Sequence, residues 1–133
     1  MYILDTNVIS AMRRPERRPT LITWLRGRPD ESLYLSVVTI GEIERGIVMQ
    51  SGRDPAFAAD LRRWVDQTIT LFADRVLPFD AAEARIWGQL TAKLGHGGAD
   101  LLIAATALSC GGVVVTENID DFTPTGVRVE NPF

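Results

Sequence analysis

Short apolar runs alternate with stretches of helical periodicity along this sequence of 133 residues. Buried strands are predicted from the apolar runs at 1–4, 33–38, 76–79, 113–115 and 127–129. Between them, apolar residues recur at helical spacing over about 6–12, 20–26, 39–50, 55–74, 80–94 and 99–109. This alternation predicts an α/β domain whose central, mostly parallel sheet of four to five strands is flanked by helices on both faces. No linker or repeat interrupts the pattern, so we expect one domain spanning residues 1–133.

Residues that favour helix starts directly follow several predicted strands. Asp5 comes at once after the first strand and can cap a short helix. Thr39 with Glu42 three residues later fits a capping box, and so do Asp80 and Glu83. Acidic side chains are therefore expected at the connections between a strand and the helix that follows it.

Polar residues gather at the predicted carboxyl ends of strands, where open parallel sheets form their sites. Asp5 ends the first strand, Glu42 lies in the helix after the second, and a Thr-Glu-Asn segment at 116–118 follows the fourth. Asp100 opens a helix that is otherwise apolar. Carboxylates that converge repel one another unless a cation enters, and hard ions such as Mg²⁺ or Mn²⁺ prefer oxygen ligands. Such an ion could clamp a phosphate and activate a water for phosphodiester hydrolysis.

Each of these acids also has a purely structural interpretation. Asp5 could be only a helix cap, Glu42 only the acid of a capping box, and Asp100 only a favourable charge in a first helical turn. His96 is the only histidine and lies among glycines, so we expect it to be exposed rather than catalytic. Neither a zinc site nor a Ser-His-Asp triad is supported. Cys110, the only cysteine, is expected in the core.

Charge and composition narrow the possible functions. The net charge of -3 and pI of about 5.1 provide no general basic field for nucleic acid, which argues against a simple DNA-binding module but not against a nuclease. The sequence shows no signal peptide and no apolar stretch long enough for a bilayer. We therefore expect a cytoplasmic protein without a membrane segment.

Four segments resemble, in order, the motifs of the PIN-domain family. They read LDTNVIS at 4–10, SVVTIGEIERG at 36–46, ADLLIAATA at 99–107, and TEN at 116–118 followed by DF at 121–122. The likeness runs along the whole chain. It is greatest to VapC-type toxins of bacterial toxin–antitoxin pairs, including the FitB-like branch.

The resemblance implies an endoribonuclease that depends on Mg²⁺ or Mn²⁺. The metal-binding acids would be Asp5, Glu42 and Asp100. Asn118 stands where many members of the family have a fourth acid, and its amide offers an oxygen without a charge. Asp121 or Glu117 could compensate, although Asp121 could equally cap the following turn.

Hydroxyl and arginine side chains complete the predicted site. Hydrogen bonds that orient the acids are expected from Thr6, Ser36 and Thr116. The segment 13–18 is a candidate RNA contact or, equally, a solvated loop; its arginines are Arg13, Arg14, Arg17 and Arg18.

The resemblance also implies partners other than the RNA substrate. Family members usually form homodimers and are inhibited by a cognate antitoxin, here one of VapB-like type. The antitoxin lays an apolar segment over the first helices and often inserts an Arg near the acids. Residues that could supply the groove, or belong to the core, are Ile9, Met12, Leu21, Ile22, Trp24, Leu25 and Ile47.

The leading hypothesis is in-line attack on an RNA phosphodiester by a metal-activated water. Asp5 and Asp100 would hold the principal metal, and Glu42 would bind it or orient the water. One alternative is a phosphatase or phosphotransferase with Asp5 as nucleophile, although Asn7 stands where such enzymes have a second Asp. The other is a non-catalytic, metal-binding interaction module, which the amide at Asn118 favours.

Overall fold

Five parallel strands form the centre of the computed structural model, which describes all 133 residues. Their order is β3-β2-β1-β4-β5, and β1 lies in the middle. The central strand pairs with both neighbours, since Ile3 is in register with Tyr34 on one side and Val114 on the other. The strands are β1 (Tyr2–Leu4), β2 (Leu33–Ser36), β3 (Val76–Leu77), β4 (Val113–Val115) and β5 (Arg128–Glu130). The prediction of an α/β domain with a parallel sheet is confirmed.

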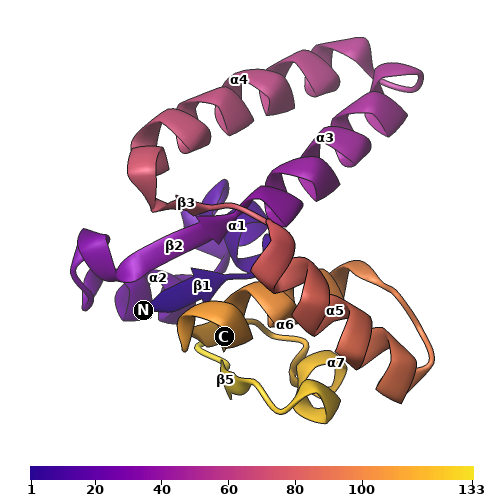
Figure 1. Cartoon of the computed structure of the whole chain (residues 1–133). Helices are drawn as coiled ribbons and strands as arrows, with labels where there is room; N and C mark the ends of the chain where they lie inside the picture. Colours follow the sequence, from indigo (N-terminus) through magenta and orange to yellow (C-terminus); the bar gives the residue numbers. More distant parts are fainter.

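Seven α-helices connect the strands and cover the sheet (Figure 1). They are α1 (Thr6–Met12), α2 (Pro19–Arg26), α3 (Val37–Ser51), α4 (Pro55–Phe72), α5 (Ala81–Leu94), α6 (Ala99–Cys110) and α7 (Ile119–Phe122). Short 3-10 turns occur at Pro15–Arg17, Asp30–Ser32, Ala73–Arg75 and Thr123–Thr125. No helix is both long enough and apolar enough to cross a membrane.

The two faces of the sheet carry separate hydrophobic cores. Successive side chains of a strand point to opposite faces, so Ile3 and Val114 belong to one cluster and Leu4 and Val115 to the other. Helices α1 to α4 contribute to the cluster around Leu4, and α5 to α7 to the cluster around Ile3. Both faces are therefore covered by helices, as predicted.

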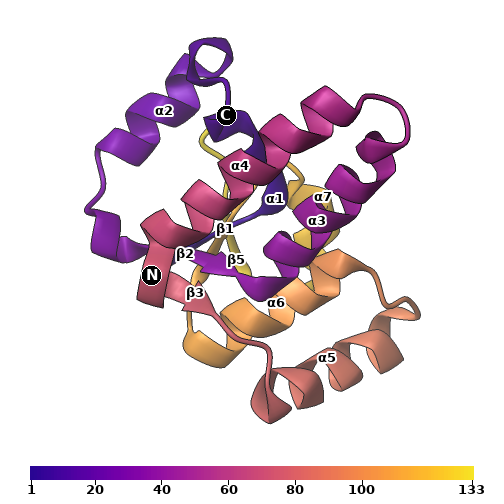
Figure 2. The same ribbon diagram turned by 90° about the horizontal axis from the view of Figure 1, so that it is seen from above.

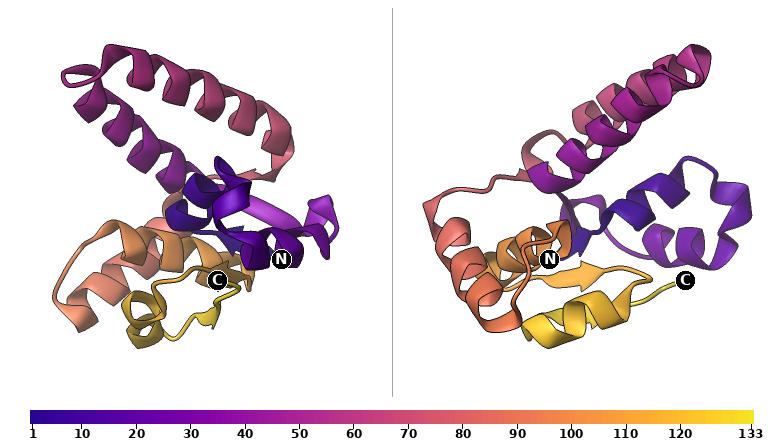
Figure 3. Two further views of the ribbon diagram at one scale, coloured as in Figure 1. Left: turned by 180° about the vertical axis from the view of Figure 1, so that it is seen from behind. Right: turned by 90° about the vertical axis from the view of Figure 1, so that its right-hand side faces the viewer.

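Helices α3 and α4 form a hairpin that rises from the sheet (Figure 1). Seen from above, α4 of the hairpin lies over the strands, with α2 and α5 on different sides of the molecule (Figure 2). The tip of the hairpin stands clear of the rest of the molecule (Figure 3).

The start of α3 differs from the prediction. Ser36, not Thr39, is the N-cap, because its Oγ accepts a hydrogen bond of 3.1 Å from the Val38 backbone N. The preceding strand therefore ends at Ser36, and the predicted capping box of Thr39 and Glu42 is wrong. The second predicted capping box, of Asp80 and Glu83, is confirmed at the start of α5.

Cys110 also lies elsewhere than predicted. It is the last residue of α6 and is exposed, whereas the segment 103–107 of the same helix is fully buried or nearly so. Only the middle of α6 packs against the sheet, so its final turn, which includes Cys110, extends beyond the core.

Candidate functional site

A cavity of about 730 Å³ opens at the carboxyl ends of the central strands. Its volume lies in the range typical of ligand sites. Oppositely charged side chains line it. The acids are Asp5, Glu42, Asp100 and Glu117, and the bases are Arg13, Arg14, Arg17 and Arg18. The sheet order β2-β1-β4 brings the acids into one place, because it sets the ends of these three strands side by side.

Asp5 links the central strand to the first helix. Its backbone N continues the sheet by donating to the Val115 carbonyl at 2.9 Å, and its side chain caps α1. Only 4% of the residue is exposed. Oδ1 accepts a hydrogen bond of 2.8 Å from the Thr6 backbone N, and Oδ2 accepts one of 2.8 Å from Thr116 Oγ1. Capping thus uses one carboxylate oxygen, while a side chain from beyond β4 holds the other.

Burial raises the pKa of Asp5 above its ordinary value of 3.8. The hydrogen bonds from Thr116 and Thr6 lower it, and the negative charges of Glu42 and Asp121 raise it further. Two hydrogen-bond donors therefore favour the ionised carboxylate, while burial and the neighbouring negative charges disfavour it. A nearby cation would remove that conflict.

Glu42 lies in the second turn of α3, past the helix start, and its carboxylate faces α1 instead of the backbone. Thr6 Oγ1 donates to Glu42 Oε1 at 2.5 Å and lies 3.4 Å from Thr39 Oγ1. The structural interpretation of Glu42 as a capping acid is therefore excluded by the position of the Ser36 cap. Thr6 contacts two acids at once, Asp5 through its backbone and Glu42 through its hydroxyl.

The Thr116 hydroxyl connects three parts of the site. It donates to Asp5 and accepts hydrogen bonds from Asn7 Nδ2 at 3.1 Å and from the Asn118 backbone N at 2.9 Å. A hydroxyl has one proton and two acceptor positions, so all of its hydrogen-bonding capacity is used. The fully buried Thr116 side chain therefore fixes Asp5 relative to both α1 and the segment after β4.

Asp100 is half-buried in the first turn of α6 and lines the same cavity. Burial raises its pKa, the charges of Asp121 and Asp5 raise it further, and the nearby His96 lowers it. His96 is exposed, as predicted, but it lies close enough for its charge to act on Asp100. Asp121, in α7, does not line the main cavity and instead borders an adjoining one beside Glu117 and Asn118.

The donor set suits a hard cation better than any other group. The acids and Asn118 all provide oxygen atoms as possible ligands. His96 and Cys110, the only histidine and cysteine, do not line the cavity. As the side chains stand, no three of the acids are close enough together to bind a single ion. A shared ion would therefore need a change of side-chain rotamer, whereas the repulsion that neighbouring acids exert on Asp5 and Asp100 favours its entry.

The four arginines that line the cavity form no ion pair with its acids. The ion pairs of the structure are Arg28–Glu130, Arg62–Glu44 and Arg63–Asp60, all elsewhere. Two of the four approach aromatic rings, with Arg13 Cζ 4.9 Å from the centre of Phe57 and Arg18 Cζ 5.5 Å from that of Phe133. These guanidinium groups are available to an anionic ligand.

A smaller, mostly apolar cavity of about 250 Å³ lies between α1 and α4. Its apolar lining comes from Ile9, Met12, Trp64, Leu71 and Phe72. Only two of these belong to the set predicted to form a groove for a partner. In that set, Ile9, Leu21, Leu25 and Ile47 are buried in the core, and Met12, Ile22 and Trp24 are partly buried against it.

The site contains residues to which the sequence assigned no role. Asn7, within the first motif, bonds Thr116, and its Oδ1 is buried without a partner. Phe57 and Phe133 line the cavity. Ser36 caps α3 and contacts none of the acids through a hydrogen bond, unlike Thr6 and Thr116. The only indication in the sequence that Asn7 belongs to the site was its position directly after Asp5 and Thr6 in the first motif.

Comparisons with known proteins agree on one family. The model described as "PIN domain" matches residues 2–125. Toxin FitB of Neisseria gonorrhoeae is 36% identical over 100% of this chain and 99% of its own length. VapC ribonuclease Y4jK of Sinorhizobium fredii is 33% identical over 100% and 98%. The crystal structure of FitAcB from N. gonorrhoeae superposes with a TM-score of 0.85 at 34% identity, covering 99% of this chain and 98% of that one.

Proposed function

Because this chain belongs to the PIN-domain family, we propose that it is a metal-dependent endoribonuclease and the toxin of a type II toxin–antitoxin pair. One observation carries the proposal: Asp5, Glu42 and Asp100 line a single cavity together with four arginines that have no carboxylate partner. Clustered carboxylates can bind divalent cations, and unpaired guanidinium groups can bind phosphates. A polyanion that is cleaved at a metal centre needs both.

Asp5 and Asp100 would hold a divalent ion, with Glu42 as a third ligand or as the group that orients water. When bound, Mg²⁺ or Mn²⁺ would supply positive charge that neutralises a phosphate and lowers the pKa of water. Asn118 and Asp121 are candidates for completing the ligand set. Asn118 lines the cavity and offers an amide oxygen, whereas Asp121 acts on both aspartates through its charge.

The chain's own hydroxyls and backbone hold Asp5 and Glu42 in place beside the cavity. Thr116 and the Thr6 backbone direct both oxygens of Asp5, and the Thr6 hydroxyl directs Glu42. Thr6 therefore contacts both Asp5, which caps α1, and Glu42, which lies on α3.

The arginines after α1 would contact the RNA. Arg14, Arg17 and Arg18 are exposed, and none pairs with an acid of the chain. Planar guanidinium groups match the geometry of phosphate oxygens. The four arginines beside the acids make this part of the surface locally basic, so a protein with a net charge of -3 could still bind RNA there.

A VapB-like antitoxin and a second copy of the chain complete the proposal. The apolar cavity between α1 and α4 offers a place for an apolar antitoxin segment. Its apolar residues include the exposed Leu71, at 68% exposure, so the cavity reaches the surface. It adjoins the proposed catalytic cavity through α1, which contributes residues to both.

Cleavage of RNA by purified protein tests the proposal. We expect cleavage with Mg²⁺ or Mn²⁺, none with EDTA, and none for Asp5→Asn, which should keep the fold because Asn also caps helices. Glu44→Gln is the matched control, because Glu44 is an acid of α3 that pairs with Arg62 outside the cavity. Full ribonuclease activity in Asp5→Asn would exclude the assignment. Release of phosphate from a small ester would instead support a phosphatase.

A further inference from the structure

Phe57 occupies an unusual position for an aromatic residue of an amphipathic helix. Its spacing with Leu61, Trp64 and Val65 predicts that it faces the core. In the structure, Phe57 belongs to neither core cluster and is not among the residues packed against them. It lines the cavity of the acids instead. A half-buried ring that faces a polar cavity gains little from burial, so packing alone does not explain it.

Two rings in this cavity each have an arginine against them. Arg13 lies over Phe57, and Arg18 lies over Phe133. Both distances fall within the range of about 6 Å for cation–π contacts. The rings come from α4 and from the segment after β5, so tertiary structure alone places them beside the arginines of the segment after α1. Two composite surfaces of ring and guanidinium result.

The remaining two arginines of the cavity differ from these. Arg14 and Arg17 line the same cavity and are exposed, and they contact neither a ring nor an acid. Their guanidinium groups are free to follow a flexible phosphate backbone. Arg13 and Arg18 are held by their rings and are less free to do so. The four arginines thus form two pairs: Arg13 and Arg18 lie against aromatic rings, and Arg14 and Arg17 are free to bind phosphate.

This difference corresponds to the two parts of a nucleotide. Phosphates are bound by mobile cations, whereas unpaired bases stack on aromatic rings and on guanidinium planes. Bases within a duplex are already stacked and cannot reach such surfaces. We propose that Phe57 with Arg13, and Phe133 with Arg18, form stacking positions for two unpaired bases of the RNA, while Arg14 and Arg17 bind its phosphates. The proposal rests on the RNA substrate proposed above.

The test measures binding rather than cleavage, so it does not depend on the metal. In an Asp5→Asn background with EDTA, the Kd is determined for a short single-stranded RNA and for a strand of the same length and charge that lacks all bases. Phe57→Leu should weaken binding of the RNA about fivefold or more but change binding of the abasic strand by less than about twofold. Phe57→Trp, which keeps an aromatic face, should retain binding of the RNA.

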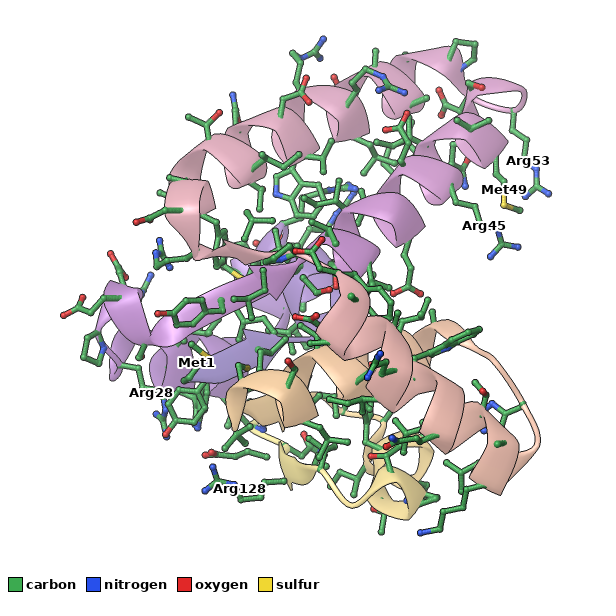
Figure 4. The ribbon with its side chains drawn as sticks, in the orientation of Figure 1. Met1, Arg28, Arg45, Met49, Arg53 and Arg128 are labelled. Atoms are coloured by element: carbon green, nitrogen blue, oxygen red, sulfur yellow. The ribbon has the colours of Figure 1, made fainter.

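The salt dependence separates the two pairs of arginines. Arg14→Gln should lower the slope of log Kd against log salt by about 0.7 for both strands, since one phosphate contact is lost. Phe57→Leu should leave the slope unchanged. Arg45→Gln is the matched control, because Arg45 lies outside the cavity, and Figure 4 shows it projecting from the hairpin together with Met49 and Arg53.

Three outcomes overturn the proposal. If Phe57→Leu weakens binding of the RNA and of the abasic strand equally, the ring only supports Arg13. If it weakens binding of neither strand, the rings serve a different ligand, such as a protein. Failure of the Asp5→Asn protein to bind either strand would refute RNA as the substrate and the stacking positions with it. Circular dichroism of each variant confirms that the fold is retained.

Discussion

Replacing Thr116 by Val tests whether one buried hydroxyl holds the acidic site together. Valine has the same shape, so the change removes three hydrogen bonds without leaving a cavity. Asp5 Oδ2 loses its donor, and Asn7 Nδ2 and the Asn118 backbone N lose their acceptor. Thr116 is fully buried, so water cannot replace the hydroxyl at its own position.

The expected cost follows from the kind of bond that is lost. A hydrogen bond to a charged group contributes about 1.5–3 kcal/mol to stability, and a neutral one about 1 kcal/mol. The Asn118 backbone N can turn to solvent because that residue is exposed, so only the Asn7 contact adds a substantial further loss. We therefore expect Thr116→Val to lower the free energy of unfolding by about 2–4 kcal/mol at neutral pH.

The pH dependence of this loss gives a second, sharper test. Burial raises the folded pKa of Asp5, and the Thr116 bond partly opposes that rise, so its removal raises the pKa further. The penalty of an ionised, buried Asp5 applies above the folded pKa and disappears as pH falls towards the unfolded value near 3.8. The variant should therefore be most destabilised at neutral pH and recover relative to wild type in acid.

Urea unfolding in EDTA at neutral and acidic pH measures both quantities. Thr116→Ser keeps the hydroxyl and should retain most of the stability. Thr123→Val is the matched control, since its hydroxyl bonds the Ile119 carbonyl at an exposed position. A loss below about 0.5 kcal/mol, or a loss that is equal at both pH values, would refute the reasoning.

Further expectations concern the acids and one glycine. Asn118→Asp should lower stability in EDTA, because it adds a charge to a repulsive site, and enlarge the rise in Tm on adding Mg²⁺; an unchanged Mg²⁺ response in a thermal melt would contradict a role in the metal site. The pKa values of Asp5 and Asp100 are raised, so Mn²⁺ affinity measured by calorimetry should fall as pH drops through these raised values, at higher pH than for ordinary carboxylates. Gly112→Ala should cost about 1–3 kcal/mol in urea unfolding, because a Cβ would clash with a fully buried β1 side chain, whereas Gly52→Ala, with open space around it, should cost far less.

Repulsion within the cavity links the proposed chemistry to stability. The charge of Asp5 raises the pKa of Asp100, the charge of Glu42 raises that of Asp5, and Asp121 raises both. Such a site stabilises the folded protein less without a cation than with one, since an ion that binds only the native state shifts the folding equilibrium. Removal of divalent metal should therefore lower Tm if the acids bind it as proposed.

Much of the fold follows from local patterns in the sequence. Apolar runs predicted the position of every strand to within a few residues, because a strand between two helical layers must be apolar on both faces. The Asp80 and Glu83 capping box was predicted correctly for a similar reason, since its contacts lie within one turn. The prediction for Thr39 and Glu42 was wrong because Ser36 competes for the same helix start, and local spacing does not decide between two possible caps.

The acids were selected from the sequence by their positions beside predicted strand ends and by the family motifs. What the sequence determined was which oxygen-bearing side chains follow buried strands, because that depends on neighbours in the chain. Only the tertiary structure decided that Thr6 and Thr116 hold them, that Cys110 is exposed, and that Phe57 leaves the core. Those outcomes depend on the strand order and on how far each helix extends past the sheet, and both arise from contacts between segments that are distant in the chain.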